Sequence, residues 1–71
     1  MQAIKITGDM IRLGQLLKLG GVVESGAAGK ELLASGAVLV NGSVETRRGR
    51  QLHDDDLVEV GEWEFRISAA R

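Results

Sequence analysis

Apolar residues recur at helical spacing near the start of the chain. One apolar helix face is formed by residues three or four positions apart, namely Met10, Leu13, Leu16 and Leu17. Asp9 precedes this face and is a residue type that caps helix N-termini well. Gly20-Gly21 follows the face and interrupts helical order. We therefore predict a first helix that is capped by Asp9, starts at Met10 and ends at the glycine pair.

The same spacing predicts a second helix directly downstream. Its apolar positions are Ala28, Leu32 and Leu33. Ser25 offers a capping hydroxyl at the N-terminus, and Gly36 is the residue type most often found just past a helix C-terminus. We therefore predict a second helix between Ser25 and Gly36.

After this helix the hydrophobic period changes to two, which predicts strands. Val38 and Val40 alternate with their neighbours, and Asn41-Gly42 is the strongest short-range signal for a hairpin. Val44 continues the second strand of that hairpin. The alternation of Ile4–Ile6 predicts a further strand at the start of the chain.

The C-terminal third predicts two more strands. One strand contains Leu52 and Leu57–Val60, with the polar turn 53–56 between them. The last strand is Trp63–Ile67, with its large side chains on one face. We assign the aromatic rings of Trp63 and Phe65 to the core. The predicted fold is α+β: two packed helices against a small, mostly antiparallel sheet of four to five short strands, in one domain over residues 1–71.

Charge is distributed unevenly along the chain. Its 71 residues carry nine basic and ten acidic side chains, a net charge of −1. Residues 1–50 have a charge of +3, whereas residues 51–71 have a charge of −4. Because charges act over a Debye length of about 8–10 Å, a slightly acidic chain can still present a basic face to a polyanion.

The side chains needed for catalysis are missing from the sequence. His53 is the only histidine and cysteine is absent, so one chain offers no histidine pair, metal triad or thiolate site. Residues 26–30 resemble a phosphate loop, but Glu24 and Glu31 stand where that motif needs glycine and serine or threonine. We expect no enzymatic activity, cofactor, metal or small-molecule substrate. The chain shows no signal-peptide pattern or apolar span, so we expect a cytoplasmic location and no membrane partner.

The densest charge cluster is Arg47-Arg48-Gly49-Arg50. A planar guanidinium pairs with phosphate through two hydrogen bonds, and glycine lets a ligand approach the backbone closely. At a hairpin edge, the same charges would also discourage strand-to-strand aggregation. The cluster alone leaves open whether these residues bind phosphate or form a solvated hairpin edge.

Two lysines favour the phosphate interpretation. Lys18 lies with Gly14 on the face of the first helix that points away from its leucines. Lys30 lies near Gly26, opposite the apolar face of the second helix. We therefore predict that the paired helices present both lysines and both glycines to one side. An RNA contact there would be mainly electrostatic and shape-based.

The run Ser25–Gly42 combines a serine-led helix, a terminal glycine, alternating valines and Asn-Gly. This pattern resembles the signature of the S4 RNA-binding domain family, which is named after the fourth protein of the small ribosomal subunit. Arg12-Leu13 followed by Leu16-Leu17 is similar to the family's first helix, and residues 52–60 are similar to its later turn and strand. The chain is most similar to the short, stand-alone bacterial proteins of the family.

Three residues depart from the family pattern. Gly14 stands where the family commonly has aspartate, and Asp55 replaces the turn glycine. Gly26 replaces the usual arginine after the serine, which removes a phosphate-binding group. This last departure leaves more of the expected binding to residues 47–50.

The resemblance implies an αL-type helix pair backed by a small sheet, which binds structured RNA, often ribosomal or transfer RNA. Residue by residue, it implies a binding site made by Arg12, Lys18, Ser25, Lys30, Arg47, Arg48 and Arg50. Ribosome assembly or translation is the expected process, and ribosomal proteins are further expected partners. An alternative stays open: a protein-interaction module that docks on a ribosomal or assembly partner through its acidic C-terminal half.

Overall fold

The computed structural model describes residues 1–69. Two helices and seven short strands follow one another along this part of the chain: β1 (Gln2–Ile6), β2 (Ile11–Arg12), α1 (Leu13–Leu19), α2 (Gly26–Ala34), β3 (Val38–Val40), β4 (Ser43–Val44), β5 (Gln51–Leu52), β6 (Leu57–Val60) and β7 (Trp63–Ala69). None of the helices in residues 1–69 is long and apolar enough to cross a membrane. The fold class is α+β, as the sequence predicts.

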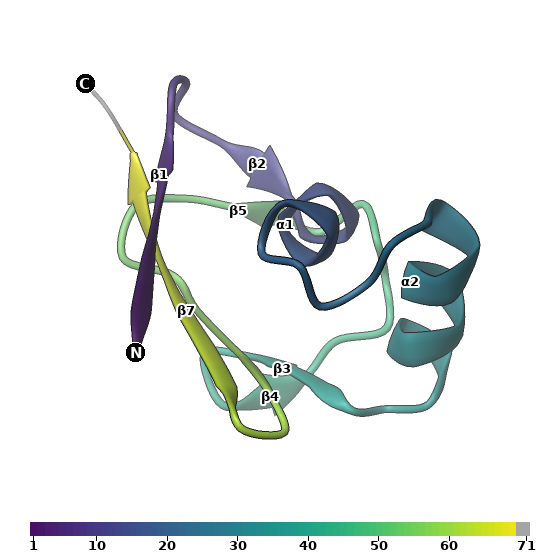
Figure 1. Cartoon of the computed structure of the whole chain (residues 1–71). Helices are drawn as coiled ribbons and strands as arrows, with labels where there is room; N and C mark the ends of the chain where they lie inside the picture. Colours follow the sequence, from purple (N-terminus) through teal and green to yellow (C-terminus); the bar gives the residue numbers. More distant parts are fainter. Residues whose placement is uncertain (70–71) are drawn as a thin grey trace.

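Five strands form the main sheet in the order β1-β7-β6-β3-β4. β1 runs parallel to β7, and the other neighbours are antiparallel, so the sheet is mostly antiparallel as expected. β2 and β5 form a separate two-stranded antiparallel sheet. Figure 1 shows α1 near the centre of the molecule, α2 beside it, and the edge pair β1 and β7 on the opposite side.

The core lies between α1 and the main sheet. The leucines of α1 at spacing three and four, Leu13, Leu16 and Leu17, are completely buried. They pack in one cluster with Leu33 of α2 and with sheet residues such as Phe65. In the sheet, buried side chains lie opposite one another across the strands, as Val58 does with Phe65. This cluster fixes the positions of both helices relative to the sheet.

The first helix begins three residues later than predicted, at Leu13 with Arg12 as its N-cap residue. The preceding residues Ile11–Arg12 are extended and pair with β5. The backbone N–H groups of Leu13 and Gly14 donate to carbonyls of the distant residues Arg50 and Arg48, both at 2.9 Å. Long-range partners therefore satisfy the helix start, and an Asp9 cap is not formed.

The predicted strand containing both Leu52 and Leu57–Val60 is also wrong, because the structure divides it. Leu52 belongs to β5 and pairs with β2, whereas β6 joins the main sheet. Between them, Asp55 adopts a φ of +70°, which ends the strand. The His53 backbone N–H donates to Asp56 Oδ2 at 2.7 Å and closes this turn.

The second helix and its hairpin are confirmed. Ser25 Oγ accepts the backbone N–H of Ala28 at 3.1 Å, and Gly36 follows the helix with a φ of +81°. Asn41 and Gly42 have φ angles of +51° and +86°, the pair of positive values that a two-residue type I′ hairpin needs.

Trp63 is not a core residue, although the sequence assigned it to the core. Its side chain is 44% exposed, while Phe65 is completely buried. The two rings stack with centroids 5.6 Å apart and an interplanar angle of 21°. Trp63 therefore covers the end of the core with one ring face.

Candidate nucleic-acid interface

A buried carboxylate organises residues 45–50, which we call the arginine loop. The side chain of Glu45 is 8% exposed and accepts Arg47 Nη2 and Arg50 Nη1, each at 3.0 Å. It also accepts the backbone N–H groups of Thr46 and Arg47 at 3.0 Å. Hydrogen bonds from the Arg47 side chain, the Arg47 backbone and the Arg50 side chain hold the pKa of Glu45 far below its usual range. The carboxylate therefore stays ionised and fixes the loop from inside.

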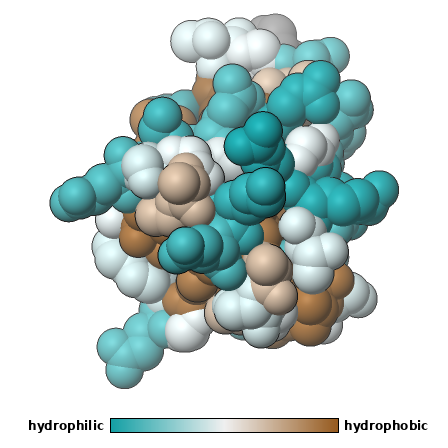
Figure 2. Space-filling model, turned by 90° about the vertical axis from the view of Figure 1, so that its right-hand side faces the viewer, coloured by the Kyte–Doolittle hydropathy of each residue, from teal (hydrophilic) through white to brown (hydrophobic). Residues whose placement is uncertain are grey.

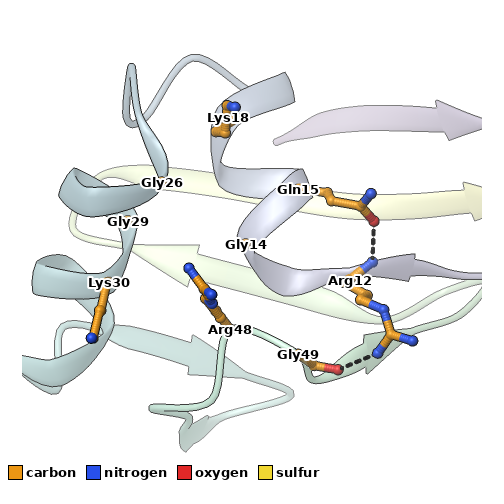
Figure 3. A pocket seen from close by; sticks show the side chains of 9 residues that line it. All are labelled: Arg12, Gly14, Gln15, Lys18, Gly26, Gly29, Lys30, Arg48 and Gly49. Carbon is orange, nitrogen blue, oxygen red and sulfur yellow. Dashed lines mark hydrogen bonds between the residues drawn. The ribbon is translucent and has the colours of Figure 1, made fainter.

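The arginine loop is also fixed to the start of α1. The carbonyls of Arg48 and Arg50 accept the first two backbone N–H groups of the helix. Arg12 Nη1 donates to the Gly49 carbonyl at 3.1 Å, and the Arg12 backbone N–H donates to Gln15 Oε1. These bonds hold residues 48–49 beside α1 and facing α2 (Figure 3).

The two helices and the loop enclose a pocket of about 300 Å³. Its lining comes from three segments: Arg12, Gly14, Gln15 and Lys18 around α1, Gly26, Gly29 and Lys30 of α2, and Arg48 and Gly49 of the loop. Four of these residues are cations, which we call the basic rim: Arg12, Lys18, Lys30 and Arg48. No acidic side chain of the described residues lines the pocket. The pocket therefore suits an anionic ligand.

A comparison with known protein families identifies the fold that carries this pocket. The profile described as the S4 domain matches residues 4–68 of the chain. The chain belongs to the S4 domain family. The S4 domain is a non-catalytic RNA-binding fold, so the chain is not an enzyme, in agreement with the sequence.

Two known proteins are similar over most of the chain. The probable ribosome maturation protein RlbA of Bacillus subtilis (strain 168) is 47% identical over 57 residues, which are 80% of each chain. The solution structure of YbcJ from E. coli is 33% identical and superposes with a TM-score of 0.73, covering 97% of this chain and 89% of YbcJ. YbcJ is described as revealing an αL motif involved in RNA binding.

The S4 domain brings four of the seven predicted site residues together, and they are the four cations of the basic rim. The prediction that both helix lysines share one side with Gly14 and Gly26 is confirmed, because all four residues line the pocket. Figure 2 shows the face that carries α2, with hydrophilic side chains gathered across its middle.

The other three predicted residues do not line the pocket. Ser25 uses its oxygen to cap α2. Arg47 and Arg50 pair with Glu45, and Arg47 is 74% exposed on the outer side of the S4 domain. The three arginines of the cluster are therefore not equivalent: two hold the loop, and Arg48 lines the pocket.

Sequence reasoning gave Glu45 no role, and it missed the hydrogen bond that the Gly49 carbonyl accepts from Arg12. Both act through contacts that have no local periodic signal: Gly49 offers its carbonyl to Arg12, 37 positions away in sequence. A single carboxylate two positions before the first of three arginines was the available signal for Glu45. Such a pattern is compatible with an ion pair between the carboxylate and an arginine, and equally with a run of solvated charges.

Proposed function

We propose that this chain binds structured RNA through the basic rim and takes part in ribosome maturation. The observation that carries the proposal is the convergence of Arg12, Lys18, Lys30 and Arg48 around one pocket between the helices of an S4 domain. The name of RlbA and the description of YbcJ support it independently. Arg47, whose side chain is 74% exposed, contributes a further phosphate contact outside the pocket.

The charge distribution explains how a chain of net charge −1 binds a polyanion. The acidic C-terminal part of the chain, which the structure describes over residues 51–69, contributes none of these residues to the pocket. Phosphates at the basic rim are within a Debye length of several cations, so attraction there outweighs the remote negative charge. Affinity should therefore be strongly salt-dependent, because bound phosphates release counterions.

The name of RlbA favours ribosomal RNA over transfer RNA as the ligand. A chain acting on ribosomal RNA works in the cytoplasm, the location expected from the sequence. The S4 match over residues 4–68 supports a single domain as the binding unit.

The test is a fluorescence titration of a labelled ribosomal RNA hairpin at several salt concentrations. Each phosphate contact contributes about 0.7–0.9 to the slope of log affinity against log salt. Lys18→Gln, Lys30→Gln and Arg48→Gln together should flatten the slope by about two to three units. Lys5→Gln, which removes an exposed cation outside the pocket, is the matched control. An unchanged slope in the folded triple variant contradicts the proposal.

A second candidate function is docking of a ribosomal or assembly protein through the acidic half. The observation that favours it is Trp63, 44% exposed and flanked by exposed Glu62 and Glu64 beside the N-terminus. Glu62→Lys with Glu64→Lys should weaken association with ribosomal particles while leaving the salt slope on naked RNA unchanged. Unchanged association with the particles would rule out this surface.

A further inference from the structure

Glycine backbone forms part of the pocket wall. Gly14, Gly26, Gly29 and Gly49 all contribute to the lining, and a Cβ at Gly26 would meet no atom within 4 Å. The pocket is therefore a hollow with a partly bare backbone wall and four cations at its rim. A paired RNA stem presents a convex row of phosphates, which reaches a rim without filling the hollow behind it. A ligand that fills the hollow must therefore project from the stem.

Arg48 is the side chain best placed to meet such a ligand. Arg47 and Arg50 are engaged by Glu45, and Arg12 donates to Gly49. The Arg48 guanidinium makes no hydrogen bond or ion pair with any of residues 1–69. Figure 3 shows it extending from the loop into the space between α1 and α2. One planar cation with open faces and unused donors therefore stands inside the pocket.

The position of Arg48 is set by its neighbours. Its carbonyl accepts the backbone N–H of Gly14 at 2.9 Å. A Cβ at Gly14 would lie 3.3 Å from Arg48 Cβ, so glycine allows the side-chain stem to lie close against α1. The backbone and the first carbons of the Arg48 side chain are thus fixed beside α1, so that the guanidinium starts from the wall of the pocket.

We infer that the pocket takes one unpaired nucleotide of the RNA, with its base stacked on the Arg48 guanidinium and its flanking phosphates on Lys18 and Lys30. The inference rests on the proposed RNA binding and specifies which part of the RNA enters the site. A volume of about 300 Å³ exceeds what a single phosphate needs and is at the lower end for small organic ligands. Splayed bases stacked on arginine planes are a common mode of RNA recognition.

The experiment compares three RNA hairpins of the same stem sequence: one fully paired, one with a single bulged 2-aminopurine, and one with an abasic bulge. The bulged hairpin should bind at least about fivefold more tightly than the other two, because a stacked base contributes about 1–3 kcal/mol. The fluorescence of 2-aminopurine should change on binding, since its stacking partner changes.

A variant that fills the pocket isolates the effect of shape from that of charge. Gly26→Leu places a side chain in the open space and removes no cation. It should bring the bulged hairpin to the affinity of the paired one. Gly8→Leu is the matched control, because a Cβ at Gly8 also meets no atom within 4 Å and Gly8 lies outside the pocket. Circular dichroism verifies folding of both variants.

The two claims fail separately in this design. The salt slope of the paired hairpin tests the proposed electrostatic binding, and the ratio of bulged to paired affinity tests the nucleotide pocket. Equal affinities for all three hairpins, with a normal salt slope, overturn the inference and leave a rim that binds phosphates alone. A bulge preference that persists in folded Gly26→Leu also overturns it, because the base then binds elsewhere.

Discussion

Gly20 is a residue whose identity is dictated by a neighbour in space. It ends α1 with a φ of −77°, which any residue adopts, so backbone freedom does not explain it. A Cβ at Gly20 would lie 2.8 Å from Cε1 and Cζ of Phe65, a completely buried ring. Glycine is therefore present to let the helix end approach the sheet.

Replacing Gly20 by alanine should destabilise the fold by about 1–3 kcal/mol, because the ring cannot yield without disturbing the core. The measurement is urea unfolding followed by circular dichroism. Gly8→Ala, which meets no atom within 4 Å, should stay within about 0.5 kcal/mol of the parent. If Gly20→Ala is as stable as the parent, Phe65 is not packed against the helix end as described.

Glu45 should make stability depend on pH. Its pKa is lower in the folded chain than in the unfolded one, where the pKa of glutamate is about 4.3. Its stabilising contribution is complete above the unfolded pKa and is lost as the pH falls through the folded pKa. Glu45→Gln should therefore be less stable than the parent at pH 7 and should lose less stability between about pH 5 and pH 2.

Urea unfolding at a series of pH values measures this difference. Glu31→Gln is the control for removing an exposed carboxylate and should stay within about 0.5 kcal/mol of the parent at pH 7. Parallel pH profiles for Glu45→Gln and the parent would show that the carboxylate does not hold the arginine loop.

The residues of the site that could be predicted from the sequence are those with a local signal or a match to the family. Helical periodicity placed Lys18 and Lys30 on one side, because that geometry is local. The basic cluster 47–50 supplied Arg48, and the family resemblance added Arg12. The different roles of Arg47, Arg48 and Arg50 were not predictable, because they depend on which way each side chain points relative to a buried carboxylate.

Among the elements, those defined by local signals were predicted most accurately. The Ser25 cap and the Asn41-Gly42 turn need only neighbouring residues, and both were correct. The start of α1 depends on carbonyls of residues 48 and 50, and β5 depends on pairing with β2. Such partners lie far away in sequence, so periodicity placed the start of α1 too early and merged β5 with β6.

Ser25→Ala tests whether α2 depends on its cap. Loss of the bond from the Ala28 N–H to the serine oxygen should cost about 1 kcal/mol, measured by thermal or urea unfolding. Ser68→Ala removes an exposed hydroxyl from β7 and serves as the control. Equal stability of Ser25→Ala and the parent would mean that water replaces the cap without loss.

At the scale of the whole molecule, the basic rim and one acidic patch occupy different regions. The basic rim lies between the helices, whereas Glu62 and Glu64 flank Trp63 at the start of β7 beside the N-terminus. Figure 1 shows α2 and the hairpin between β6 and β7 in separate parts of the molecule. RNA at the basic rim and a basic protein at Glu62 and Glu64 would therefore approach through different surfaces.

The most direct test of the central claim, that RNA binds at the pocket between α1 and α2, is mapping of the contact surface by NMR. A ribosomal RNA hairpin titrated into the ¹⁵N-labelled protein should shift the backbone amides of Gly14, Gly26, Lys30 and Gly49, which line the pocket. The amide signals of residues 62–64 should not shift. Shifts that instead cluster at residues 62–64, with the pocket amides unchanged, would contradict the account.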